Sequence, residues 1–97
     1  MVLITESQYP WSSTIQAVEA LGKIAEAPEY VKISGPFSTA EKGVGLRVVS
    51  LYEFDNVRYR EVIDFITKRM LNFMTVPDYT WSMTPFYEMD EALKLLE

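Results

Sequence analysis

A segment that occurs twice constrains the fold of this chain more than any other feature. Residues 28–37 and 77–86 each begin with Pro-acid-Tyr and end, at the same interval, with Pro-Phe. Each copy follows a stretch in which apolar residues recur at helical spacing. The chain is therefore predicted to consist of two helix-to-strand units in tandem.

Length and charge bound the class of protein. The 97 residues, 48% of them hydrophobic, are expected to form a single domain, 1–97. A net charge of −5 opposes binding to nucleic acid or to an anionic membrane, and no apolar run approaches the ~20 residues of a membrane span. The chain has no cysteine and no histidine, so disulfides and thiolate or imidazole chemistry are excluded. A cytoplasmic protein without a cofactor is expected.

Four strands and three helices are predicted. The first strand covers residues 2–4 and ends at the polar residues 6–8, and the best strand runs from Gly45 to Phe54. The other two strands are residues 30–37 and 79–87, and residues 38–43 are expected to form a loop. A short terminal helix is predicted over residues 90–97.

The two main helices are predicted from caps and periodicity. The first has a capping box with Ser13 as N-cap and Gln16 three residues later, and Pro28 prevents its continuation. Its expected apolar face is Ile15, Val18, Leu21 and Ala25. Asp55 and Asn56 supply the turn and N-cap of the second helix. The apolar set of that helix is Tyr59, Val62, Ile63, Ile66, Met70 and Phe73.

This order of elements predicts an α+β, ferredoxin-like βαββαβ sandwich with sheet order 4-1-3-2. Both main helices would lie on one face of an antiparallel sheet. The prolines of the strands fall in strands two and four, which would be the tolerant edges. Strands one and three are apolar on both faces, yet helices cover only one face. A second copy of the sheet is expected to cover the other, giving a homodimer.

Several short segments resemble an uncharacterised prokaryotic family of short proteins of the dimeric α+β-barrel type. The segments are 28–32, 50–55, 66–69, 76–79 and 91–93, which span most of the chain after the first helix. Met70 departs from the pattern, since an aromatic is expected there. The resemblance implies two ferredoxin-like sheets packed face to face. The wider superfamily includes monooxygenases, lactone isomerases, haem-degrading enzymes and amino-acid-sensing domains, and fold does not choose among them.

Two functions are weighed for the chain. The leading hypothesis is a non-enzymatic ligand-binding or interaction module, with a cleft between sheet and helices near Tyr52, Arg69 and Trp81. Arg69 suits an anionic ligand, although its ordinary role is that of a cation at a helix C-terminus. The alternative is a cofactor-independent oxygenase or isomerase of a small aromatic or lactone-like compound, with Glu53 or a tyrosine as acid or base. A structural Glu53, which either pairs with Arg47 or Arg69 or is simply exposed near the end of its strand, is favoured over a catalytic one.

Other chemistries have little support in the sequence. Glu88, Asp90 and Glu91 form the one tight acidic cluster, but a helix start explains it better than a metal site, and no metal is expected. Thr80, Ser82 and Thr84 are read as an exposed or barrel-facing hydroxyl row without a base beside it. Residues 46–54 lack the basic signature of an RNA-recognition module.

Overall fold

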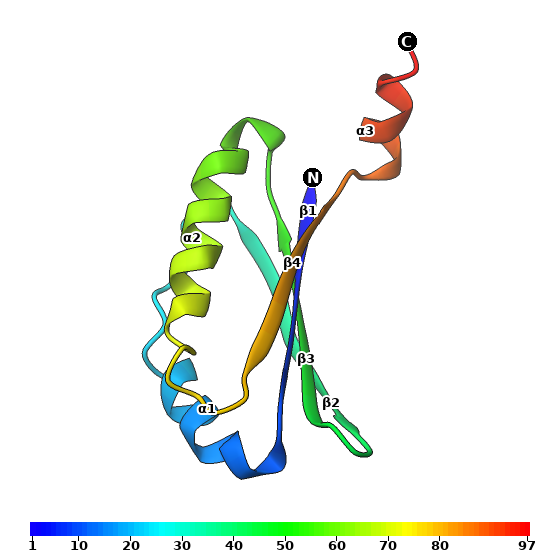
Figure 1. Ribbon diagram of the computed structural model, residues 1–97. Helices are drawn as coiled ribbons and strands as arrows, with labels where there is room; N and C mark the ends of the chain where they lie inside the picture. The colour runs from blue at the N-terminus through cyan, green and yellow to red at the C-terminus, as the bar shows by residue number, and fades with distance from the viewer.

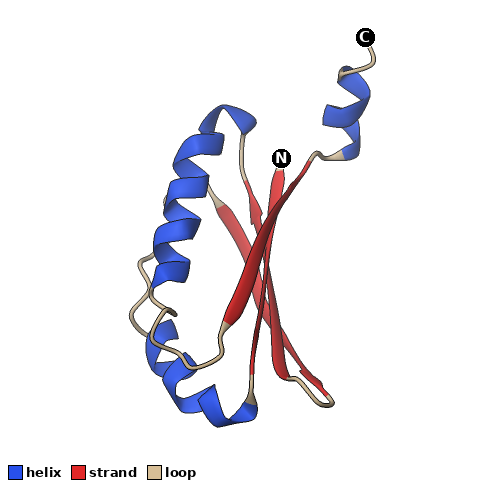
Figure 2. Cartoon of the chain, in the orientation of Figure 1, coloured by secondary structure: helices blue, strands red, loops and turns tan.

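The computed structural model describes all residues, 1–97, and has a four-stranded antiparallel sheet with two helices on one face (Figure 1). Figure 2 shows the same two layers, with the opposite face of the sheet bare. The strands are β1 (Val2–Tyr9), β2 (Lys32–Glu41), β3 (Gly45–Glu53) and β4 (Thr80–Phe86). The helices are α1 (Thr14–Leu21), α2 (Tyr59–Leu71) and α3 (Met89–Lys94). The predicted α+β class is confirmed, and the arrangement is compatible with a ferredoxin-like fold.

The sheet order is β2-β3-β1-β4, which is β4-β1-β3-β2 when counted from the other edge. Leu3 lies opposite Tyr52 of β3 and Pro85 of β4, which fixes the register of the two central strands and one edge. Pro36 and Pro85 both lie in edge strands, where a missing backbone N–H leaves no gap in the central ladder.

The core lies between the sheet and α2. Its largest fully buried side chains are Tyr52, Leu3, Ile66 and Val62. The periodicity of α2 is confirmed in its buried residues Val62, Ile66 and Met70, while Tyr59 at its start is 38% exposed. Asp55 accepts a hydrogen bond from the backbone N–H of Val57 at 3.1 Å, so the predicted cap is present at the 3₁₀ turn that leads into α2.

The predicted limits of two strands were wrong. β1 does not end at Ile4 but runs to Tyr9, because β3 and β4 bond to it on both sides and leave Glu6 and Gln8 on the bare face. Of residues 38–43, expected to form a loop, residues 38–41 belong to β2, and Lys42 and Gly43 lie in the turn of the hairpin that β2 forms with β3. Cross-strand pairing outweighs the polar composition of both segments.

The first helix differs most from expectation. Its predicted capping box is absent, because Ser13 is buried and its hydroxyl donates to the carbonyl of Pro77 at 2.6 Å. The residues of α1 that face the core are the small Ala17 and Ala20. The expected apolar face is turned outward, with Ile15 73% and Val18 61% exposed. The helix also ends at Leu21, well before Pro28.

Helix α3 projects beyond the end of the sheet, on the side away from α1 and α2 (Figure 1). It begins at Met89 with Glu88 as N-cap, and Glu88 and Glu91 form a reciprocal capping box. Glu91 also pairs with the N-terminal ammonium of Met1 at 2.6 Å, and this contact lowers the pKa of the Glu91 carboxyl. The acidic residues near 88–91 therefore cap a helix. None of the three α-helices is long and apolar enough to cross a membrane.

Candidate functional site

A cleft between the sheet and the two main helices is the candidate site. It comprises two adjoining cavities of about 170 and about 50 Å³. The residues that line both cavities come from all four elements around them and from the segment before β4: Ser7, Leu21, Pro36, Val48, Phe73 and Tyr79. The cleft lies where the expected binding site was placed, on the helix-covered face of the sheet.

Small side chains explain why this part of the interior is hollow. On the core face of β1, Leu3 is followed by Thr5 and Ser7, both buried and both too short to reach the helix layer. Opposite them, Ala17 and Ala20 are the buried residues of α1. Two facing surfaces of small residues leave a space that no side chain fills.

An aromatic wall closes one side of the cleft. The Tyr79 ring stacks on Phe73 with centroids 4.8 Å apart and on Tyr9 at 5.8 Å, and both pairs are nearly parallel. Gly45 allows Tyr9 its position, since a Cβ there would come within 2.4 Å of the Tyr9 carbonyl oxygen and the backbone has φ +122°. The three rings form a stack, and all three residues line the cavity of about 170 Å³.

The polar groups of the cleft are hydroxyls and one guanidinium. Ser7 and Tyr79 line both cavities; Thr5, Ser50, Tyr52 and Arg69 line the smaller one, and Tyr9 and Ser38 line the larger one. Burial raises the pKa of the Tyr79 hydroxyl, an effect that the nearby Ser7 hydroxyl opposes. Burial also raises the pKa of Tyr9. Both phenols are therefore held in their neutral, hydrogen-bonding form.

The raised pKa of Tyr79 predicts a pH dependence of stability. The native state keeps the Tyr79 proton, which the unfolded chain releases near pH ~10. The contribution of the protonated Tyr79 to the free energy of unfolding is therefore complete below that pH and is lost as pH rises through the native pKa. Tyr79→Phe should therefore lose less stability than the parent between about pH 10 and 11. Thermal unfolding of the parent and Tyr79→Phe across this pH range measures the difference in stability. Tyr87→Phe, at a tyrosine outside the cleft, is the control, and parallel curves for parent and Tyr79→Phe would refute the assignment.

Arg69 connects the cleft to the outer surface. It lies in the last turn of α2, half-buried, and its guanidinium donates to the carbonyl of Ala25 at 3.4 Å. The guanidinium carbon also lies 5.9 Å from the centre of the Phe65 ring. Of the four residues predicted to form the site, the structure brings Arg69 and Tyr52 together in one cavity.

Glu53 and Trp81 do not join them. Glu53 lies at the end of β3 on the bare face, opposite Val2 and Lys32, and lines neither cavity of the cleft. Its expected salt bridge is also absent, because Arg47 pairs with Glu6 instead. Trp81 is 37% exposed and lines a separate shallow hollow with Glu6 and Gln8. The residues that the sequence missed are Ser7 and Phe73, and the alternation of residues 3, 5 and 7 on the core face of β1 was the signal for Ser7.

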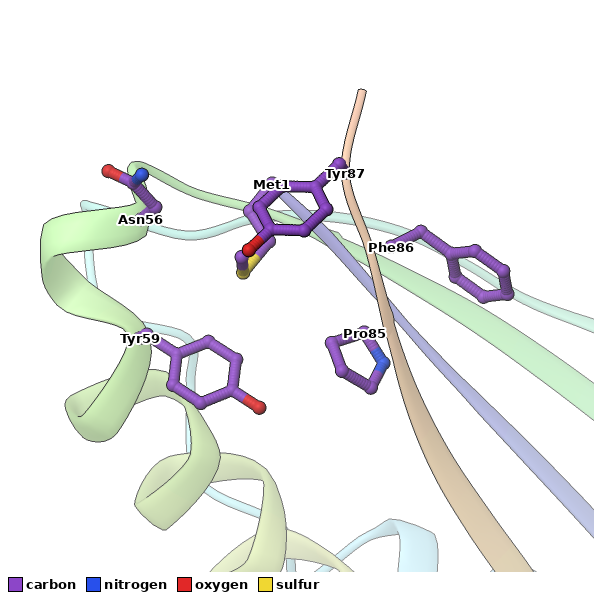
Figure 3. A pocket seen from close by; sticks show the side chains of 6 residues that line it. All are labelled: Met1, Asn56, Tyr59, Pro85, Phe86 and Tyr87. Carbon is purple, nitrogen blue, oxygen red and sulfur yellow. The ribbon is translucent and has the colours of Figure 1, made fainter. Parts of the chain in front are cut away.

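A second hollow, of about 360 Å³, lies at the opposite end of the molecule (Figure 3). Tyr59 from the start of α2 and Pro85 from the end of β4 face each other across it, with Met1 and Tyr87 at its upper border (Figure 3). Its polar side chains are the Asn56 amide and two phenols, and it has no charged side chain. This hollow is wider than the cleft but has fewer groups that could orient a ligand.

Comparison with known proteins adds no assignment. No protein-family model matches the chain, and no curated protein matches it.

Proposed function

We propose that this protein is a non-enzymatic, homodimeric module that binds a small ligand in the cleft between its sheet and helices. The observation that supports it is the lining of the cleft, in which aromatic and aliphatic side chains surround a few polar groups. This is the usual composition of small-molecule sites. The proposal places the chain among the dimeric α+β-barrel proteins, as its resemblance implies, and in the cytoplasm, which suits a chain without cysteine.

The bare face of the sheet supports the homodimer. Its centre holds Val2 and Ile4 of β1 beside Val49 and Leu51 of β3, with Phe37 59% exposed towards one edge and Phe86 50% exposed in the other edge strand. The paired Arg47 and Glu6 lie on the same face. Glu53, Lys32 and Gln8 lie on this face too, so its apolar centre is bordered by polar residues and by charges of both signs. Such a surface fits a second copy of the same chain better than a partner with charges of one sign.

The area of the bare sheet face limits the interface that it can form by itself. Four strands about 4.8 Å apart and seven residues long give a flat outline of roughly 450 Å². A stable interface buries about 800 Å² on each partner. Side chains that stand out from the face add area, and so does α3, which projects on the side away from α1 and α2 (Figure 1). Helix α3 and the residues after it carry the exposed apolar side chains of Met89, Leu93 and Leu96. A dimer through the sheet therefore also engages α3.

The enzymatic alternative has less support. It requires an acid or base inside a closed site, and Glu53 lines neither cavity. Tyr79 does line the cleft, but burial raises its pKa, which opposes the ionisation that a tyrosine base needs. The binding module therefore remains the proposal.

Mapping of small-compound binding by ¹H–¹⁵N chemical shifts tests the proposed function. Among neutral and charged compounds of up to about ten non-hydrogen atoms, some should shift the amides of Ser7, Val48 and Tyr79. Val48→Phe fills the cleft from β3 and should abolish these shifts.

Val57→Phe is the matched control, because it adds the same volume at a side chain that is 81% exposed and outside the cleft. It should bind as the parent does. The proposal fails if no compound shifts the cleft amides, or if binding survives Val48→Phe unchanged.

A further inference from the structure

We infer that the ligand of the cleft is a small organic acid, whose apolar body lies against the aromatic wall and whose carboxylate is bound by Arg69. The inference rests on the proposed function, since it specifies the ligand of the same cleft. It rests on two observations about Arg69. This residue lies between two hollows, and no carboxylate lines either of them.

Arg69 belongs to two hollows at once. On the inner side it lines the cavity of about 50 Å³ with Tyr52 and Phe73. On the outer side it lines a surface hollow with Lys23 and Lys68. Its hydrogen bond to Ala25 spans the gap between α2 and the segment after α1, so the guanidinium lies at the boundary between the apolar interior and solvent. An amphipathic ligand in the cleft would place its polar end at this boundary.

The outer hollow is basic in an acidic protein. Lys23, Lys68 and Arg69 line it, and no aspartate or glutamate does. None of the four ion pairs of the structure involves any of these three cations, although the chain carries 14 acidic residues. Arg69 makes one long hydrogen bond, to a neutral carbonyl, so most of its five N–H donors are free for an anion.

The helix dipole is the competing explanation for these cations. Lys68 and Arg69 lie in the last turn of α2, where positive charge is stabilised by the C-terminal carbonyls. The dipole amounts to about half a negative charge at that end, which three positive side chains exceed. The dipole explains why cations occur at this position, but it does not explain why Arg69 also lines the interior cavity.

The size of the cleft limits the acid. Cavities of about 170 and about 50 Å³ lie below the usual range of ligand sites, so the apolar body is about the size of a single ring or a short chain. Phenylacetate is a suitable probe, since its ring can lie beside Tyr79 and Phe73 while its carboxylate extends towards Arg69. Phenylacetamide has the same shape without the charge.

The test compares these two compounds by ¹H–¹⁵N titration at pH 7. Phenylacetate should bind at least about tenfold more tightly than phenylacetamide, because a charged, bidentate hydrogen bond to guanidinium is stronger than one to a neutral amide. Both should shift the amides of Ser7 and Tyr79, and phenylacetate should also shift the Nε–H signal of Arg69. Arg69→Gln should remove the preference for phenylacetate, because it weakens the binding of phenylacetate more than that of phenylacetamide.

Arg60→Gln is the control, because it makes the same charge change on the same helix at a side chain that is 88% exposed. It should keep the preference. Equal binding of the two compounds in the cleft overturns the organic acid and leaves the proposed function standing. A preference that survives Arg69→Gln overturns the role of Arg69. If neither compound binds, the inference fails, and the proposed function fails with it only if the compound mapping also finds no ligand for the cleft.

Discussion

Replacing Tyr52 with alanine should lower the free energy of unfolding by about 3–5 kcal/mol, the usual cost of deleting a large buried ring. Tyr52 is 2% exposed and lies between β1 and β2 in the centre of the core face of the sheet. In a domain of this size the loss corresponds to a fall in melting temperature of more than about 12 °C. Thermal and urea unfolding of the parent and variant measure it.

Trp81→Ala is the comparison that makes this result specific. Unlike Tyr52, Trp81 is 37% exposed and lies in an edge strand. Its removal should cost less than half as much stability as Tyr52→Ala, because less apolar surface returns to water. Equal losses of stability for the two variants would contradict the finding that Tyr52 is more deeply buried than Trp81.

Leu51→Lys should convert the proposed homodimer into a monomer. Leu51 lies opposite Ile4 on the bare face of the two central strands, so a lysine there would have its charge desolvated without a partner in the interface. We expect the dimer to weaken at least about 100-fold, since an uncompensated buried charge is among the most costly substitutions. Sedimentation velocity at micromolar concentration separates the two states.

Val57→Lys controls for the added charge, because Val57 is 81% exposed in the turn before α2. It should remain a dimer. A parent protein that sediments as a monomer, or a Leu51→Lys variant that dimerises as tightly as the parent, would remove the homodimer from the proposal.

Elements with one dominant signal could be predicted from the sequence. Strand β3 and helix α2 alternate or repeat strongly, and the two prolines of the edge strands limited where those strands could lie. Helix α1 could not be oriented, because its phase is set by the long-range hydrogen bond from Ser13 to Pro77 and by the burial of its small residues Ala17 and Ala20. Periodicity records where large apolar residues lie, and in α1 those residues are largely exposed.

The candidate site was predictable in its place but not in its composition. Arg69 and Tyr52 could be selected for charge and for size, and they do meet in one cavity. Ser7 was missed because polar residues at 6–8 suggested the end of a strand, whereas pairing on both sides extends β1 to Tyr9. A cavity made by small residues leaves no positive signal in a sequence, since it consists of side-chain volume that is absent.

A crystal structure of the protein with the tightest-binding compound from the chemical-shift mapping tests the central claim most directly. The account predicts two copies packed through their bare sheet faces, with one molecule of the compound in each cleft between Val48 of β3 and the Phe73–Tyr79 wall. A compound found elsewhere, such as in the hollow beside Tyr59 and Pro85, together with sheets that do not face each other, would contradict it.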